Sequence, residues 1–117
     1  MLTYRTSQEW RTRAACRGTD PALWDTPTHL KHDDIAIPEQ LAMCKGCPVL
    51  RECAADSALA RDSGTIRAGI PVAATGGVGR LRSWKALSMI ATTGDVDAAR
   101  EYAFADYGVA MAGAGNE

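Results

Sequence analysis

The chain has 117 residues, with 13 Lys or Arg and 14 Asp or Glu, which gives a formal net charge of −1. This length fits one small domain, and one Phe, three Trp and three Tyr leave few large side chains for its core. No apolar run approaches the roughly 20 residues of a membrane span, and no apolar signal segment occurs at the start. The sequence therefore predicts a cytoplasmic protein with no membrane association, in which four Cys favour metal or redox chemistry over disulfides.

The near-zero net charge hides an uneven distribution along the chain. Residues 1–94 hold 12 basic and 9 acidic side chains, whereas residues 95–117 hold one basic and 5 acidic side chains. A segment with excess acidic charge repels nucleic acid phosphates. We therefore expect any phosphate contact to come from the first of these two parts.

The first elements in chain order are short and carry helix-start signals. Residues 7–15 read as a helix with Thr6 as its N-cap and Glu9 three residues later, the spacing of a capping box. Asp20 followed by Pro21 predicts a second short turn, since Asp caps helices and Pro fits the first helical position.

Two further helices are predicted where proline opens a helical stretch. Residues 25–34 are polar and read as a loop, after which Pro38 opens a helix over about 38–46. Pro48 opens the next helix, over about 48–61.

The second half of the chain reads as two helices after a glycine-rich stretch. Residues 70–80 contain repeated Gly without apolar periodicity and predict a loop or linker. Apolar residues then recur at helical spacing over about 80–91. One face of a last helix is marked by Val96, Ala99, Ala103 and Tyr107.

No segment reads as a convincing strand, so the predicted fold class is all-α: a small helical domain with a helical C-terminal extension. The expected division is a cysteine-containing domain over residues 1–70, a Gly-rich linker over 71–80 and a helical extension with an acidic end over 81–117.

The four cysteines form the most informative pattern. They are Cys16, Cys44, Cys47 and Cys53, in the arrangement C-x27-C-x2-C-x5-C. The close pair lets two sulfurs converge from one turn, and the helix opened by Pro48 directs a third toward the same centre. An iron–sulfur cluster, a structural zinc ion, and two disulfides or buried free thiols all remain open from spacing alone.

Three segments together resemble the WhiB-like family of small iron–sulfur transcription regulators of actinobacteria and their phages. Residues 10–24 read W-R-x-x-A-A-C-R-x-x-D-P-x-L-W, residues 44–53 read C-x-x-C-P-V-x-x-x-C, and a Gly-containing turn follows at 65–69. The resemblance runs from about residue 8 to residue 70 and favours the cluster over zinc. It implies a divergent or phage member of the family.

The resemblance also implies a cofactor, two partners and a role. The implied cofactor is a [4Fe–4S] cluster on Cys16, Cys44, Cys47 and Cys53, so the helical domain is expected to be organised around it. The implied partners are the C-terminal domain of the primary sigma factor of RNA polymerase and the adjacent promoter DNA. The expected role is transcription regulation, with a possible response to O2 or NO, and with neither enzymatic activity nor a small-molecule substrate.

The expected contacts with sigma are the residues that match the apolar positions of the family and its turn: Trp10, Leu23, Trp24, Ile66 and Arg67. The family turn usually reads G-V/I-W-G-G, whereas residues 65–69 read T-I-R-A-G, so Arg67 replaces the Trp. Arg67 could instead face an acidic patch or a DNA phosphate. The two Trp could equally be core residues in a chain with so few large side chains.

A basic group near the start of the helix predicted over 80–91 is the candidate DNA contact, and consists of Arg80, Arg82 and Lys85. A solvated helix face explains the same three charges. Two other functions remain open. One is a thiol–disulfide oxidoreductase that works through Cys44 and Cys47, and the other is a zinc-stabilised adaptor.

Overall fold

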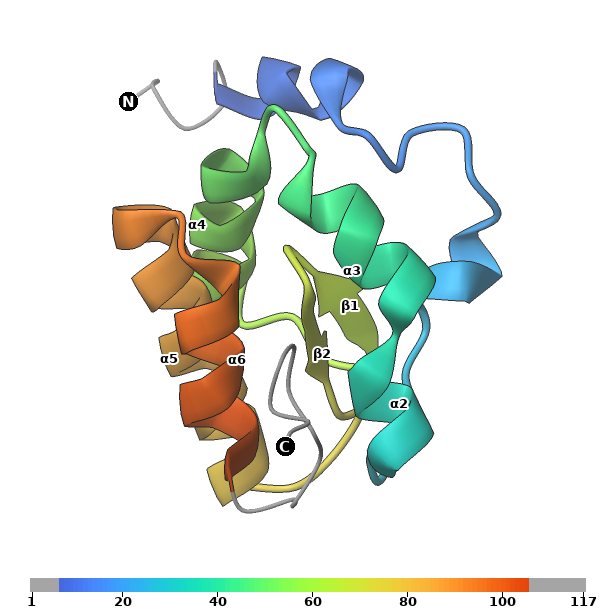
Figure 1. The fold of residues 1–117 in the computed structure, drawn as a ribbon, viewed down its shortest axis with the longest axis vertical. Coiled ribbons are helices and arrows are strands. Elements are labelled where there is room, and N and C mark those ends of the chain that lie inside the picture. The colour runs from blue at the N-terminus through green and yellow to red at the C-terminus, as the bar shows by residue number, and fades with distance from the viewer. Residues whose placement is uncertain (1–6, 106–117) are drawn as a thin grey trace.

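The computed structural model describes residues 7–105, which fold around a short β-hairpin (Figure 1). The fold is mostly helical, with one two-stranded sheet, so the expectation of an all-α protein is wrong in this respect. In chain order the elements are the 3₁₀ helices η1 (Ser7–Arg13) and η2 (Pro21–Trp24), then α2 (His32–Ala36), α3 (Pro38–Lys45), α4 (Leu50–Ala60), β1 (Thr65–Arg67), β2 (Ile70–Val72), α5 (Val78–Thr93) and α6 (Val96–Phe104).

The hairpin occupies the turn at residues 65–69 and the start of the stretch that was expected to be a linker. Its strands pair antiparallel, with Arg67 opposite Ile70 at the turn end. Ala68 and Gly69 connect them with φ angles of +52° and +83°, the two left-handed residues that a tight hairpin loop requires. Three-residue strands, one of them containing Pro71, leave little periodicity, which is why the sequence did not reveal them.

Most of the predicted helices are confirmed. The helices opened by Pro38 and Pro48 correspond to α3 and α4, and the helix predicted over about 80–91 lies within α5. The turn at Asp20 is also confirmed, because its carboxylate accepts a hydrogen bond of 3.0 Å from the backbone N–H of Ala22.

Two local predictions differ from the structure. The first predicted helix is a 3₁₀ helix, in which the Thr12 hydroxyl donates to the carbonyl of Glu9 at 2.9 Å, a side-chain bond that competes with α-helical pairing. The predicted loop over 25–34 overlaps the start of α2, whose first turn is closed by Asp34 accepting from the N–H of Lys31 at 2.9 Å. The expected cap Thr6 and the last face residue Tyr107 lie outside the described residues.

The hairpin lies between two groups of helices (Figure 1). Helices α4, α5 and α6 pack on one side, and α2 and α3 lie on the other. The core joins all these parts and includes Ile35, Ala54, Ile70, Val72, Leu87, Ile90, Ala99 and Phe104. Only residues 73–77 separate β2 from α5. The predicted division into a domain over 1–70, a linker over 71–80 and an extension over 81–117 stays a prediction. No helix within residues 7–105 is long and apolar enough to cross a membrane.

Helix α6 is fastened to the hairpin by a buried arginine. Arg100 is 3% exposed, and its guanidinium donates to the carbonyl of Gly69 at 2.7 Å and to the carbonyl of Ile35 at 2.6 Å. Burial lowers the pKa of Arg100. One side chain of α6 thus connects the hairpin turn with the end of α2.

The hairpin turn itself is wedged between α3 and α6. A Cβ atom on Gly69 would lie 3.0 Å from Cγ1 of Val96 and 3.2 Å from Cδ1 of Leu41. It would also lie 3.9 Å from Cβ of Cys44. Gly69 therefore contacts both α6, through Val96, and the part of α3 that carries Cys44.

Candidate metal centre

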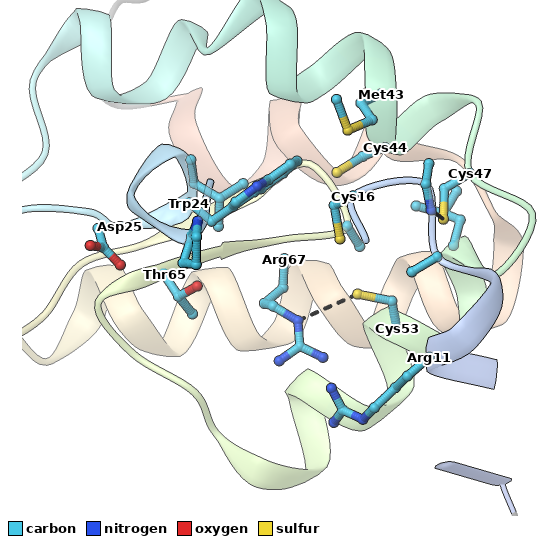
Figure 2. Close-up of a pocket in the computed structure, with 16 residues that line it drawn as sticks. Arg11, Cys16, Trp24, Asp25, Met43, Cys44, Cys47, Cys53, Thr65 and Arg67 are labelled. Carbon is cyan, nitrogen blue, oxygen red and sulfur yellow. Dashed lines mark hydrogen bonds between the residues drawn. The ribbon is translucent and has the colours of Figure 1, made fainter. Parts of the chain in front are cut away.

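All four cysteines line a single cavity of about 380 Å³ (Figure 2). Cys16 follows η1, Cys44 lies in the last turn of α3, Cys47 lies between α3 and α4, and Cys53 lies in the first half of α4. Residues far apart in sequence thus line one pocket, although within residues 7–105 no three Cys, His, Asp or Glu side chains are grouped so that they could hold one metal ion.

The close pair is positioned by the end of α3. The N–H of Gly46 donates to the carbonyl of Ala42 at 3.2 Å, and the N–H of Cys47 donates to that of Cys44 at 3.1 Å. This tight turn places both sulfurs beside the cavity. Cys53 then joins them from α4, where its N–H donates to the carbonyl of Val49 at 2.9 Å.

Cys16 comes from an exposed turn, and two contacts hold that turn in place. The N–H of Ala15 donates to the sulfur of Cys47 at 3.4 Å. Arg11, in η1, forms an ion pair of 2.6 Å with the buried carboxylate of Asp56 on α4. The segment that carries Cys16 is therefore attached to the element that carries Cys53.

Apolar side chains form much of the remaining wall. Trp24, Met43, Leu50 and Ile66 line the cavity together with the cysteines. The indole N–H of Trp24 donates to the hydroxyl of Thr19 at 2.9 Å, which fixes the ring at the pocket wall. These groups give the pocket a largely apolar wall, although Cys16 is exposed and Cys47 and Cys53 are partly exposed.

The surroundings disfavour uncompensated thiolates at two of the cysteines. Burial, followed by the charge of Cys53, raises the pKa of Cys44 to about 12, although the N–H of Gly69 opposes this shift. Burial, followed by the charges of Cys53 and Cys47, also raises the pKa of Cys16. A positively charged centre in the cavity would reverse this effect, because metal ligation requires thiolates and releases their protons.

A group of charged residues borders the cavity beside Cys53. Its members are Arg11, Asp56, Asp62 and Arg67, here called the Arg67 network. Sequence reasoning missed the first three. One signal was available: Asp56 lies three residues after Cys53 on the same helix, so both side chains share one face.

The expected sigma contacts differ in exposure. Leu23 is 46% exposed, and Trp24 is half-buried at the cavity. Trp10 and Ile66 are buried, with 6% and 4% exposed. Arg67 faces an acidic pair, as one alternative suggested, but that pair belongs to the chain itself.

The expected DNA contacts lie in the first half of α5. Lys85 is exposed, whereas Arg80 donates to the carbonyl of Gly76 at 2.6 Å and places its guanidinium 5.4 Å from the centre of the Trp84 ring. Arg61 approaches the same ring at 5.2 Å and joins this basic group from the end of α4. Arg82 is half-buried on the same helix.

Comparison with known proteins gives one family match. The model of the family described as transcription factor WhiB matches residues 10–72, which include all four cysteines and both strands. No curated protein and no solved structure matches the chain. Because the matched segment spans more than half of the 117 residues, the chain belongs to the WhiB family of transcription factors.

Proposed function

We propose that this protein is a cytoplasmic, non-enzymatic transcription regulator whose four cysteines bind a [4Fe–4S] cluster, and which binds the C-terminal domain of the primary sigma factor. The single observation that carries the proposal is one pocket lined by Cys16, Cys44, Cys47 and Cys53 in a chain of the WhiB family.

The shape of the site favours a cluster over a zinc ion. A structural zinc ion needs four sulfurs about 2.3 Å from one point. Within residues 7–105, no three Cys, His, Asp or Glu side chains converge in a way that could hold one metal ion. The four cysteines instead line part of a pocket of about 380 Å³, a space that suits a centre with several metal atoms.

The cofactor would supply a redox-active centre and four covalent links between segments. The residues of the chain supply the rest: α3 and α4 present three sulfurs, and the turn after η1 presents Cys16. Loss of the centre to O2 or NO would remove the link between Cys16 and the other three cysteines and leave that segment held by contacts such as the Arg11–Asp56 ion pair. We therefore include a response to O2 or NO in the proposal.

Metal and sulfide analysis of anaerobically purified protein tests the cofactor. We expect about four iron and four sulfide per chain, with visible iron–sulfur absorbance. Cys53→Ser should lose this content, whereas Ser88→Ala, an exposed position on α5, should retain it. Zinc without iron would support the adaptor instead, and absence of both metals would refute a metal centre.

The proposed sigma contact is the turn of Leu23 and Trp24, of which Trp24 lines the cysteine pocket. Leu23 exposes an apolar side chain beside a half-buried aromatic ring, a combination typical of binding hot spots. The buried Trp10 and Ile66, and Arg67 beside the cavity, would support this surface from within.

A pulldown with the sigma C-terminal domain tests this surface. Leu23→Ala should weaken binding about tenfold, the cost of about 1.4 kcal/mol at an interface anchor. Leu59→Ala is the matched control, since Leu59 is 73% exposed on α4. Equal binding by both variants would contradict the assignment.

Promoter DNA is the second proposed partner, through Arg80, Arg82 and Lys85 on α5. The nearby Arg61 adds to the same positive charge. Lys85→Ala should weaken DNA binding by the sigma complex and reduce its dependence on salt concentration. An unchanged salt dependence would remove Lys85 from the interface.

The oxidoreductase alternative lacks structural support. Such enzymes use an attacking thiolate of lowered pKa, whereas burial raises the pKa of Cys44 to about 12. The sheet of the described residues is a single antiparallel hairpin rather than part of a βαβ unit. A disulfide-reduction assay on the metal-free protein, with Cys44→Ser as control, tests it directly.

A further inference from the structure

Arg67 lies at the end of β1 and reaches the cavity beside one of the proposed ligands (Figure 2). Its Nε donates to the sulfur of Cys53 at 3.4 Å. We propose that Arg67 is a positioning residue that raises the reduction potential of the centre held by the four cysteines. This inference rests on the proposed cluster.

The guanidinium of Arg67 is held firmly in this orientation. One terminal nitrogen donates to Asp56 at 3.2 Å, and the other donates to Asp62. Its side chain is 18% exposed, and that of Asp56 is 6% exposed. All three nitrogens of the planar fork therefore have partners, so the Nε–H remains directed at the sulfur.

Asp56 is itself fixed from a second side. Arg11 donates to the same carboxylate oxygen at 2.6 Å. The Arg67 network thus contains two arginines and two aspartates and carries little net charge of its own. The influence on the sulfur consequently comes chiefly from the nearest donor, which is the Nε–H of Arg67.

The charge state of Arg67 agrees with this role. An arginine guanidinium stays protonated in proteins. It remains a donor whether the neighbouring centre is oxidised or reduced.

The direction of the effect follows from electrostatics. One electron supplied by an electrode adds one negative charge to the centre and increases the electron density on its sulfur ligands. A hydrogen bond to a ligand sulfur stabilises this more negative state, and such bonds are among the determinants of cluster potentials. Losing the bond should therefore make the potential more negative.

Protein-film or mediated electrochemistry on the anaerobically purified full chain tests the proposal. Arg67→Leu should shift the midpoint potential to a more negative value at unchanged iron and sulfide content. Arg13→Leu removes the same charge from an exposed position on η1 and should leave the potential unchanged. An Arg67→Leu protein with a full complement of iron and the wild-type potential would overturn the proposal.

A second variant covers the case in which Arg67→Leu does not hold iron. Arg67→Leu combined with Asp62→Asn keeps the net charge of the network and removes both sides of one ion pair. It should still have a more negative potential than the wild type. Loss of iron from both variants would assign Arg67 to cluster retention and overturn the tuning role, whereas absence of iron from the wild type would refute the proposed cofactor itself.

Discussion

Arg100→Met should destabilise the fold strongly, although it lies far from the cysteines in sequence. The change preserves much of the volume of the side chain but removes the donors to the carbonyls of Gly69 and Ile35, at 2.7 and 2.6 Å. A hydrogen bond to a charged group contributes about 1.5–3 kcal/mol, and two are lost. Removing a buried cation offsets part of this loss, so we expect a net decrease of about 2–4 kcal/mol in the free energy of unfolding.

Urea denaturation followed by far-UV circular dichroism measures this decrease, with iron content determined for each sample. The expected change corresponds to a melting temperature lower by about 10 °C for a domain of this size. Lys85→Met removes a positive charge from an exposed position of α5 and should change stability by less than about 0.5 kcal/mol. A similarly small change in Arg100→Met would refute the reasoning that α6 is held by this side chain.

Three further changes test the packing around the site. Gly69→Ala should lower the free energy of unfolding by about 2–4 kcal/mol, because it adds close contacts to an unfavourable positive φ. Gly18 also has a positive φ, +87°, but open space around it, so Gly18→Ala should lower the free energy of unfolding by only about 1–2 kcal/mol in the same denaturation assay. Ser57→Ala should raise the melting temperature, since its buried hydroxyl has no hydrogen-bond partner, and its removal gains about 1 kcal/mol; an unchanged or lower value would count against this. Trp84→Phe should lower the free energy of unfolding by about 1 kcal/mol, because it removes the indole donor to the carbonyl of Asp62 at 2.8 Å. A variant as stable as the wild type would contradict that contribution.

The sequence predicted the elements that depend on local chemistry. Proline at the start of α3 and near the start of α4, and the cap at Asp20, each act within a few residues, so they can be recognised without a fold. The cysteine spacing likewise indicated that these residues lie near one another, and all four line one pocket, to which a single ten-residue segment contributes three of them.

The remaining features depend on contacts between distant segments. The hairpin was missed because Ala68 adopts a positive φ that alanine rarely takes, and because Pro71 interrupts the strand pattern. Arg67 on β1 meets its partner Asp56 on α4 only because these two elements pack together, which the sequence alone does not indicate. Arg100 is the single basic residue of segment 95–117, and nothing local in the sequence indicates that the fold buries it against the carbonyls of Gly69 and Ile35.

The contact between Gly69 and α6 has a consequence for how this chain can vary. The segment matched by the family ends at residue 72, but its hairpin turn closes against Val96 and Arg100, well beyond that boundary. The matched segment and the packed core therefore end at different points of the chain. Exchanging α6 for another helix would succeed only if the new helix leaves room for the turn where Val96 now contacts it and supplies a hydrogen-bond donor to the carbonyl of Gly69.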